Sequence, residues 1–429
     1  MTRTTLSTEP YRGTRDFYPE DMFVQHHIFS TMRTVVERFG YVSYDASILE
    51  PTDLYRAKSG SEIVDEQTYS FTDRGGRDVT IRPEMTPTVA RMVARRRREL
   101  TFPLRWYSIP NLFRYERPQR GRLREHWQLN VDAFGMIGAD IDAEIIAVAD
   151  ALMRAFGAKS DQYRIRVSNR KLLTAILASF DVTDDAAHAL TKLIDRKAKL
   201  APAEFDEQAT ALLGDRAGAF TELLAVQSID ALPDALATSD GAQELRTLLD
   251  ALRTGGIANA VFDPTLVRGF DYYTGNVFEV FDTDPTNARS LFGGGRYDDL
   301  VGIFGVDPVP GIGFGMGDVT IRDFLETHGL LPTYTSPTVV YLCRVDVAQC
   351  ELVEDIARQL REEGVSVAVD YTDRKLGMQV RTAERQAIPY VLCIGEQEAA
   401  TQVFRVKHLP TGTEHELARD ALVAFFRAR

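Results

Sequence analysis

The sequence is poor in cysteine, in long apolar runs and in net positive charge. Only three of its 429 residues are cysteines, and Cys343, Cys350 and Cys393 lack the spacing of metal ligands. Each lies among apolar residues, so we expect buried, reduced thiols and a reducing compartment. No run approaches the roughly 18 apolar residues of a membrane-spanning helix, and the first residues lack the apolar core of a signal peptide. These absences predict a cytoplasmic protein.

The net charge is −12, which excludes a protein that coats nucleic acid through a broad basic face. Any contact with nucleic acid is therefore expected to be local. With 44% hydrophobic and 26% charged residues, the chain has an ordinary globular composition. Its length suffices for two or three domains with cores of their own.

Periodicity predicts the domain organisation. Apolar residues recur at helical spacing from Met22 to Phe39, and strict alternation over 163–167 predicts an antiparallel strand. A segment rich in Ala, Leu and Asp then predicts a helical insertion, and alternating strands and helices after Pro337 predict a small α/β domain with a largely parallel sheet. The predicted parts are a first domain over 1–170 and 261–328, the insertion over 171–260, a linker over 329–336 and a last domain over 337–429.

Five arginines lie within eleven residues of the segment FRYERPQRGRLRE, namely Arg114, Arg117, Arg120, Arg122 and Arg124. The pair Arg120 and Gly121 suggests the turn of a hairpin with a basic loop. In the following strand, Gln128, Asn130 and Asp132 alternate with apolar residues and share one face. A solvated outer face explains this alternation equally well. The arginines favour a site, because their planar forks bind phosphate oxygens beside a polar strand face.

Three other segments carry candidate site residues. In TIRPEMTP, Thr86 is expected to cap a helix whose first turn holds Pro87. LVRGFDYYTG and FGGGRYDDL combine glycine, arginine, tyrosine and aspartate, but neither matches a phosphate loop or a dinucleotide fingerprint. Alone, each is explained by a glycine bend with structural aromatics. Together with the basic hairpin, they indicate a shared site.

These segments resemble the signature motifs of the histidyl-tRNA synthetases, a family of class II aminoacyl-tRNA synthetases. GTRDFYPED resembles the opening of the family, TIRPEMTP its amino-acid loop and FRYERPQRGR its second class motif. LVRGFDYY and GGGRYDDL are similar to its two histidine-specific signatures. The resemblance implies an α+β catalytic domain with an antiparallel sheet flanked by helices, a homodimer, an insertion that contacts the tRNA acceptor end, and a C-terminal anticodon-binding domain.

The resemblance also implies an activity. L-Histidine and ATP, with Mg²⁺, would give histidyl-adenylate and pyrophosphate, and histidine would then pass to the 3′ end of tRNA(His). Two opposed arginines would neutralise charge growing on the α-phosphate, so Arg114 and Arg268 are the implied catalytic residues. The resemblance assigns ATP to Arg114, Glu116, Arg122 and Arg268, histidine to Glu84, Thr86, Gln128, Asp132, Tyr272, Tyr273 and Tyr297, the acceptor end to Arg117 and Gln119, and no side chain to a metal.

Two positions depart from the family pattern. Many members have glutamate where this chain has Asp132, so its contact with the substrate amino group is expected to run through water. The third class motif ends in an arginine for the ATP γ-phosphate, but Thr320 stands there, and Arg322 lies about 200° further around a helix. This departure keeps open a non-catalytic, histidine-binding paralogue that resembles the ATP phosphoribosyltransferase regulatory subunit. The arginine-rich motif and the C-terminal domain favour the enzyme.

Overall fold

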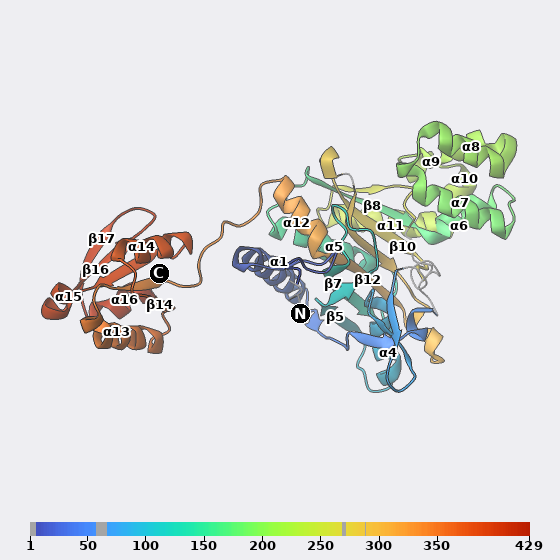
Figure 1. Cartoon of the computed structure of the whole chain (residues 1–429). Helices are drawn as coiled ribbons and strands as arrows, with labels where there is room; N and C mark the ends of the chain where they lie inside the picture. The colour runs from blue at the N-terminus through green and yellow to red at the C-terminus, as the bar shows by residue number, and fades with distance from the viewer. Residues whose placement is uncertain (1–5, 57–66, 268–271, 288) are drawn as a thin grey trace. The chain divides into compact units, whose positions relative to one another are not determined.

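The computed structural model describes residues 6–56, 67–267, 272–287 and 289–429. The chain forms two compact units, Met1–Leu331 and Pro332–Arg429 (Figure 1). The boundary between them falls inside the segment that the sequence predicts as a linker.

The first unit is built on a large mixed sheet. In its described part the strand order is β1-β5-β7-β12-β11-β10-β8-β9, and β6 pairs with β7 at one side. The β1–β5 and β8–β9 pairs are parallel and the other pairs are antiparallel. The strands are β1 (Val42–Ser43), β5 (Leu104–Ser108), β6 (Asn111–Phe113), β7 (Glu125–Phe134), β8 (Tyr163–Asn169), β9 (Ala260–Phe262), β10 (Asn276–Asp282), β11 (Ser290–Arg296) and β12 (Gly311–Gly317).

A small sheet and two helices adjoin the large sheet. The small sheet has the order β2-β4-β3, with β2 at Leu49–Pro51, β3 at Tyr69–Thr72 and β4 at Asp78–Ile81. Helix α2 (Asp53–Arg56) follows β2, and α4 (Thr86–Arg96) follows β4. The capping role expected for Thr86 is wrong, because Met85 holds the N-cap position of α4 without a side-chain bond. Thr86 is instead the first helical residue.

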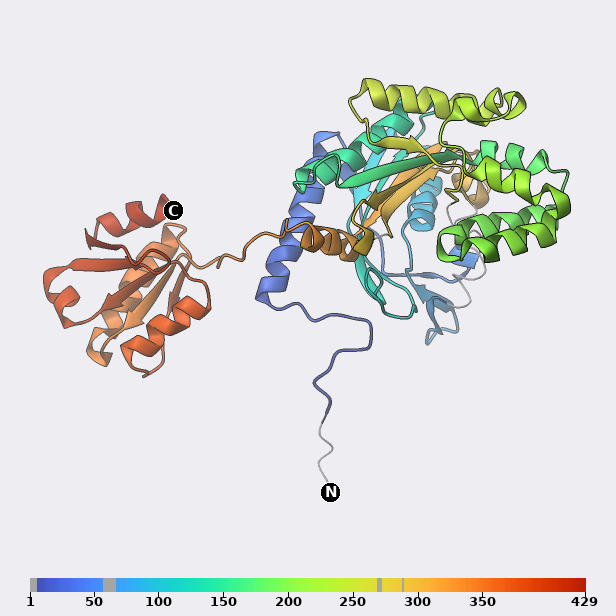
Figure 2. The same cartoon turned by 90° about the horizontal axis from the view of Figure 1, so that it is seen from above.

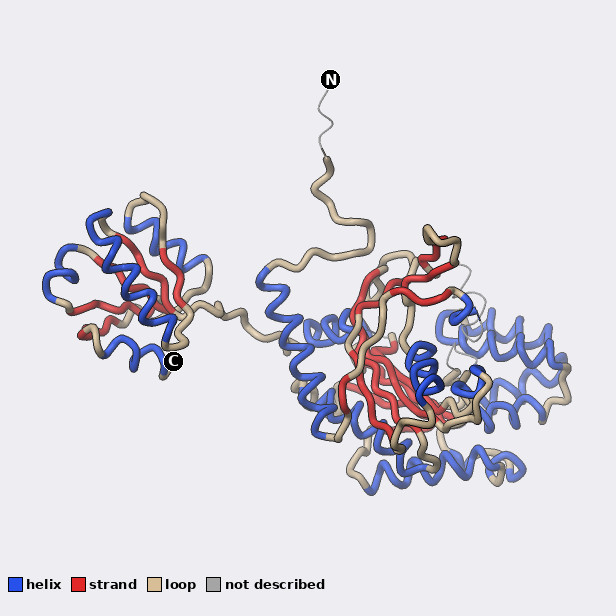
Figure 3. The backbone as a smooth tube through the Cα atoms, turned by 90° about the horizontal axis from the view of Figure 1, so that it is seen from below, coloured by secondary structure: helices blue, strands red, loops and turns tan. Residues whose placement is uncertain are grey.

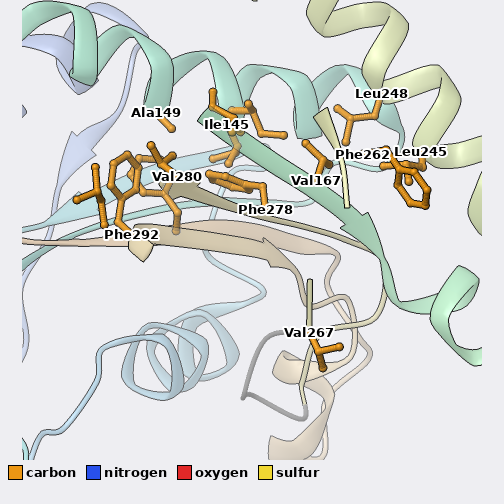
Figure 4. Packing of buried hydrophobic residues seen from close by; sticks show 14 of the residues in the cluster. Ile145, Ala149, Val167, Leu245, Leu248, Phe262, Val267, Phe278, Val280 and Phe292 are labelled. Carbon is orange, nitrogen blue, oxygen red and sulfur yellow. The ribbon is translucent and has the colours of Figure 1, made fainter. Parts of the chain in front are cut away.

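Helices cover one face of the large sheet and form the main core with it. Helices α1 (Pro19–Arg38), α5 (Ala139–Ala155) and α12 (Asp318–Thr327) contribute to one hydrophobic cluster. Figure 4 shows Ile145 and Ala149 of α5 lying over Phe278 and Val280 of β10. Because apolar residues recur along α5 at three- and four-residue steps, the helix buries one continuous stripe against the sheet.

The segment between β8 and β9 is helical, as the sequence predicts. Its helices are α6 (Arg170–Ala178), α7 (Asp184–Arg196), α8 (Pro202–Leu213), α9 (Ala217–Leu224), α10 (Asp234–Ala237) and α11 (Asp240–Thr254) (Figure 2). Side chains of Asn169, Thr183 and Ser239 cap α6, α7 and α11. Helix α11 returns to the large sheet and packs against α5 and β8. No helix in the described residues is long and apolar enough to cross a membrane.

The second unit is a five-stranded sheet with helices on both faces (Figure 3). Its strand order is β14-β13-β15-β16-β17; β13 runs parallel to β14 and β15, and the other pairs are antiparallel. The elements are β13 (Val340–Arg344), α13 (Cys350–Glu362), β14 (Val367–Val369), α14 (Leu376–Arg385), β15 (Tyr390–Ile394), α15 (Glu396–Thr401), β16 (Val403–His408), β17 (Glu414–Ala418) and α16 (Ala421–Arg427).

Alternate residues of β13 divide the core of this unit in two. Val340 and Leu342 pack with α13 and α16, whereas Tyr341 and Cys343 pack with α14 on the opposite face. The expectation of three buried thiols holds for Cys343 but is wrong for the other two cysteines, which are partly exposed.

Candidate active site

Strands β7 and β12 form the floor of two adjoining cavities. Gln128 of β7 pairs with Gly317 of β12, and Asp132 pairs with Gly313. Glycine occupies every second position of β12 from Gly311, so one face of the strand carries no side chains. A Cβ atom at Gly315 would lie 2.2 Å from the amide nitrogen of Gln128. The glycines thus leave the space above the strand to other groups.

The first cavity has a volume of about 110 Å³ and contains six of the seven residues assigned to histidine. Its walls come from the loop before α4, from β7 and from the segments flanking β10 and β11. The lining residues are Glu84, Thr86, Arg114, Gln128, Tyr272, Tyr273, Gly293, Tyr297, Gly313, Phe314 and Gly315.

Tyrosines and one carboxylate give this cavity its chemistry. The hydroxyl of Tyr272 donates to Glu84 Oε2 at 3.4 Å, and Glu84 is buried. The ring centroid of Tyr272 lies 4.8 Å from that of Tyr273 and 5.9 Å from that of Tyr297. An aromatic wall beside a buried carboxylate suits a flat ring with N–H donors or a cationic amine.

Asp132 is the one residue assigned to histidine that does not line the cavity. It is buried beneath the cavity, where its carboxylate accepts hydrogen bonds from the hydroxyls of Tyr297 and, at 3.4 Å, Tyr44. Burial raises the pKa of Asp132 to about 7, although both hydroxyls act to lower it. Asp132 therefore faces the cavity through Tyr297.

The second cavity has a volume of about 160 Å³ and contains the described residues assigned to ATP. It lies between the basic hairpin, β12 and the start of α12. Its lining residues are Arg114, Glu116, Gly121, Arg122, Leu123, His126, Gln128, Leu291, Gly315, Gly317, Val319 and Thr320.

Arg114 stands where the two cavities meet. It lines both, as do Gln128 and Gly315. Its Nε donates to the carbonyl of Pro83 at 2.9 Å, which fixes the plane of the guanidinium. No acidic residue in the described ranges lies within 4 Å of this guanidinium. An oriented cation at this junction is a site for an anion that extends across both cavities.

The electrostatic environment of the second cavity is positive. Burial and the charges of Arg114 and Arg15 lower the pKa of His126 to about 3, so its imidazole is neutral at physiological pH. Arg122 pairs with Glu116 at 3.2 Å and is otherwise exposed. Arg117 and Gln119 lie on the exposed loop outside both cavities. Of the predicted site residues, Arg268 lies outside the described residues.

The residues at the position of the third class motif make structural contacts in this chain. Thr320 donates to the carbonyl of Leu291 at 2.6 Å. The neighbouring Asp318 is buried and accepts from Arg15 at 2.7 Å and from the backbone N–H of Trp127 at 2.9 Å. Arg322 pairs with Asp21 at 2.7 Å.

Two family models match the chain. One is described as histidyl-tRNA synthetase and matches residues 13–319; the other is described as anticodon binding domain and matches residues 339–429. The chain belongs to the histidyl-tRNA synthetase family. The family resemblance of the motifs is thereby confirmed.

Relatives of similar length carry the same name. The chain is 44% identical to a histidine–tRNA ligase of Leptospira biflexa, with 95% of each chain covered, and 37% identical to one of Thermoplasma volcanium, with 98% of each covered. A crystal structure of histidyl-tRNA synthetase from Nostoc sp. matches with a TM-score of 0.84 at 23% identity and covers 99% of this chain and 100% of that one. This match confirms the predicted fold class.

Several residues of the cavities escaped prediction. Gly313 and Gly315 are not among the predicted site residues, although their period-two spacing is the signal of a bare strand face. His126 stands among basic and apolar residues of the hairpin, and no local pattern marks it as a residue of the site. Tyr44 lines neither cavity but bonds to Asp132, and it has no local signal because only the fold brings the two residues together.

Proposed function

We propose that this chain is a histidine–tRNA ligase that activates L-histidine with ATP and transfers the histidyl group to the 3′ end of tRNA(His). The observation that carries the proposal is the junction of the two cavities at Arg114. An amino acid in the first cavity and a nucleotide in the second would bring a carboxylate and an α-phosphate to one oriented cation.

In the first step, a carboxylate oxygen of histidine attacks the α-phosphorus of ATP. The new bond joins this oxygen to the phosphorus and gives an acyl phosphate, and the bond from the phosphorus to the pyrophosphate oxygen breaks. The carboxylate is already ionised near neutral pH, so no protein base is needed. Arg114 would stabilise the negative charge on the non-bridging oxygens, and the family resemblance assigns Arg268 to the other side of the phosphate.

Recognition of histidine rests on the first cavity. We propose that Glu84 and Tyr272 bind the imidazole or the α-ammonium and that Thr86, Gln128, Tyr273 and Tyr297 complete the pocket. An apolar amino-acid side chain would displace water from the buried Glu84 carboxylate and offer it no hydrogen-bond donor in return. Binding of apolar amino acids is therefore disfavoured. Asp132 would act on the amino group through Tyr297 or a water molecule.

We propose that Mg²⁺ enters with ATP as part of the substrate and acts on the pyrophosphate leaving group as a Lewis acid. The described residues contain no group of three potential ligands among His, Cys, Asp and Glu. Phosphate oxygens of ATP and water molecules would supply ligands to it, as is common for Mg²⁺. Glu116 and Arg122 would contact the nucleotide beside it.

In the second step, a ribose hydroxyl of the terminal adenosine attacks the carbonyl carbon of the adenylate and AMP leaves. We propose that Arg117 and Gln119 on the exposed hairpin loop face this acceptor end. The insertion over 171–260 would contact the same arm of the tRNA, although it carries fourteen acidic and eight basic residues. Four of these eight, Lys192, Arg196, Lys197 and Lys199, cluster at the end of α7, so contact with RNA would concentrate there.

We further propose a cytoplasmic homodimer whose subunits divide into a catalytic domain, the insertion and the anticodon-binding domain. Exposed apolar side chains near the short edge strand β1, among them Val42 and Leu49, support an interface there. Light scattering of the purified chain measures the assembly directly. A monomer at micromolar concentration would contradict the dimer.

Histidine-dependent exchange of pyrophosphate into ATP tests the proposed function. Exchange is expected with histidine and not with other amino acids. Folded protein that binds histidine but catalyses no exchange would instead support the regulatory paralogue. Crystals grown with ATP would identify the groups that hold the γ-phosphate where Thr320 replaces arginine.

A further inference from the structure

The arginine of the FGGGRYDDL segment is buried, although the proposed reaction gives it no role. Arg296 is the last residue of β11, is 7% exposed and directly precedes Tyr297 of the first cavity. Because successive residues of an extended chain point to opposite faces, Tyr297 lies on the cavity side and Arg296 meets Asp142 of α5 on the other side. A guanidinium is costly to bury unless it is paired and hydrogen-bonded, so its partners indicate its role.

Each nitrogen of the Arg296 guanidinium donates hydrogen bonds within the first unit. Nε donates to Asp142 Oδ1 at 3.0 Å, and Nη2 donates to the same oxygen. Nη1 donates to Asp298 Oδ1 at 2.9 Å and to the carbonyl of Met136 at 3.2 Å, and Nη2 also donates to the carbonyl of Gly138 at 3.4 Å. A lysine could not make all these bonds, because its three donors share one nitrogen.

These bonds hold two chain segments that bring tyrosines to the first cavity. Arg296 and Asp298 flank Tyr297 in the sequence, so their ion pair fixes the backbone on both sides of that residue. The carbonyl of Arg296 accepts from the N–H of Thr274 at 2.8 Å, and Oγ1 of Thr274 accepts from the N–H of Asp298 at 3.1 Å. Since Thr274 directly follows Tyr273, the position of Arg296 affects both tyrosines.

The two tyrosine rings rest directly on the backbone of the sheet. A Cβ atom at Gly295 of β11 would lie 2.9 Å from the ring of Tyr273, and one at Gly311 of β12 would lie 2.7 Å from the ring of Tyr297. No flexible side chain separates the rings from these strands. A shift of the end of β11 would therefore move both rings.

The polar contacts of Arg296 continue to the base of the insertion. Oδ2 of Asp142 accepts from the side-chain amide of Asn276 at 2.7 Å, and Oδ1 of Asn276 accepts from the amide of Asn169 at 2.8 Å. Asn169 caps α6, the first helix of the insertion, and also donates to Glu244 of α11 at 3.0 Å. Asp142, Asn276 and Asn169 are all buried. A buried polar network with its groups satisfied is rigid, so it fixes the position of Arg296.

We infer that Arg296 is a positioning residue for histidine binding, which holds Tyr273 and Tyr297 at the wall of the first cavity without contacting the substrate. This inference rests on the proposed function, which supplies the identity of the ligand. It deepens that function by extending the histidine site to a residue that lines neither cavity. Because the partners of Arg296 do not line the second cavity, binding of ATP should not depend on it.

The Arg296→Lys variant tests the inference. Lysine keeps a positive charge opposite Asp142, so the buried carboxylate is not left unpaired, but the planar fork is lost. KM for histidine in pyrophosphate exchange, and Kd for histidine in calorimetry, should each rise by about tenfold because the tyrosines are displaced. KM for ATP and the rate at saturating histidine should stay within about twofold. A loss of folded protein would instead lower the rate at saturation and leave both KM values unchanged.

A milder variant and a matched control accompany this test. Thr274→Val keeps the size of the side chain but removes the hydroxyl that bonds to Asp298, so KM for histidine should rise by about threefold. Arg105 of β5 also donates from two nitrogens to one carboxylate of α5, that of Glu144, at 2.8 and 2.9 Å. Arg105→Lys should leave both KM values within about twofold, because this pair holds no residue of the cavities.

Histidine affinity that stays within about twofold of the parent in Arg296→Lys and Thr274→Val would overturn the inference. An equal rise in KM for ATP would also overturn it, as would a parent protein that binds no histidine. If the lysine variant fails to fold in urea titrations, the histidine affinity of Thr274→Val decides. Absence of exchange in a parent that binds histidine would refute the proposed function separately, and calorimetry would still decide the role of Arg296.

Discussion

Replacement of Asp132 by asparagine should change how the stability of the first unit depends on pH. Burial raises the pKa of Asp132 from 3.8 to about 7. Between these values the folded protein holds a proton on this carboxyl that the unfolded chain has released. Stability therefore falls as pH rises from about 4 to about 7, because the native state binds more protons than the unfolded state.

The size of this effect on stability follows from the shift in the pKa of Asp132. Three pKa units correspond to about 4 kcal/mol, at 1.36 kcal/mol per unit. An asparagine side chain keeps the shape of the aspartate and can still accept a hydrogen bond from Tyr297, but it does not titrate. The free energy of unfolding of the Asp132→Asn variant, relative to that of the parent, should therefore increase by up to about 4 kcal/mol between pH 4 and pH 8. Half of this increase should be reached near pH 5.5.

Tryptophan fluorescence during urea unfolding gives a suitable assay. Both tryptophans of the chain, Trp106 and Trp127, belong to the first unit, so the signal reports the unit that holds Asp132. Tyr297→Phe serves as a control, since it removes one hydrogen bond to the carboxylate but keeps the titrating group. A constant difference between variant and parent over this range would refute the raised pKa.

Further predictions concern the cavities. Gly315→Ala should push the side chain of Gln128 aside. Because both cavities border this position, KM for histidine and KM for ATP should each rise by about tenfold in exchange kinetics. Unchanged KM values would contradict a wall shared by the two cavities. Tyr272→Phe should raise KM for histidine alone, since its hydroxyl bonds to Glu84. Arg268→Ala should lower the exchange rate by about 100-fold or more with little change in histidine binding in calorimetry; collapse of histidine affinity at an unchanged rate would show that its assignment is wrong.

Much of the fold follows from local periodicity. The strand alternation of Gln128 and Asp132 places both on one face, and the helical spacing from Met22 to Phe39 gives α1. In the structure Gln128 lines the first cavity but Asp132 does not, because Tyr297 comes from another part of the chain and covers the carboxylate. The position of Tyr297 over Asp132 depends on long-range strand pairing, which no local sequence pattern encodes.

The departure at the third class motif could be seen in the sequence but not explained there. Thr320 is a short polar residue on a predicted helix, which says nothing about its partner. The structure supplies the carbonyl of Leu291, at the start of a strand far away in the chain. Likewise, the buried partners of Asp318 come from the N-terminal segment and from β7.

The wall that both cavities share also links their occupancies. Arg114, Gln128 and Gly315 border each cavity, so a ligand that reorients one of these groups changes the free energy of binding in the other. The four states with neither, either or both ligands form a closed thermodynamic cycle. Whatever factor histidine exerts on the affinity for ATP, ATP must therefore exert on the affinity for histidine.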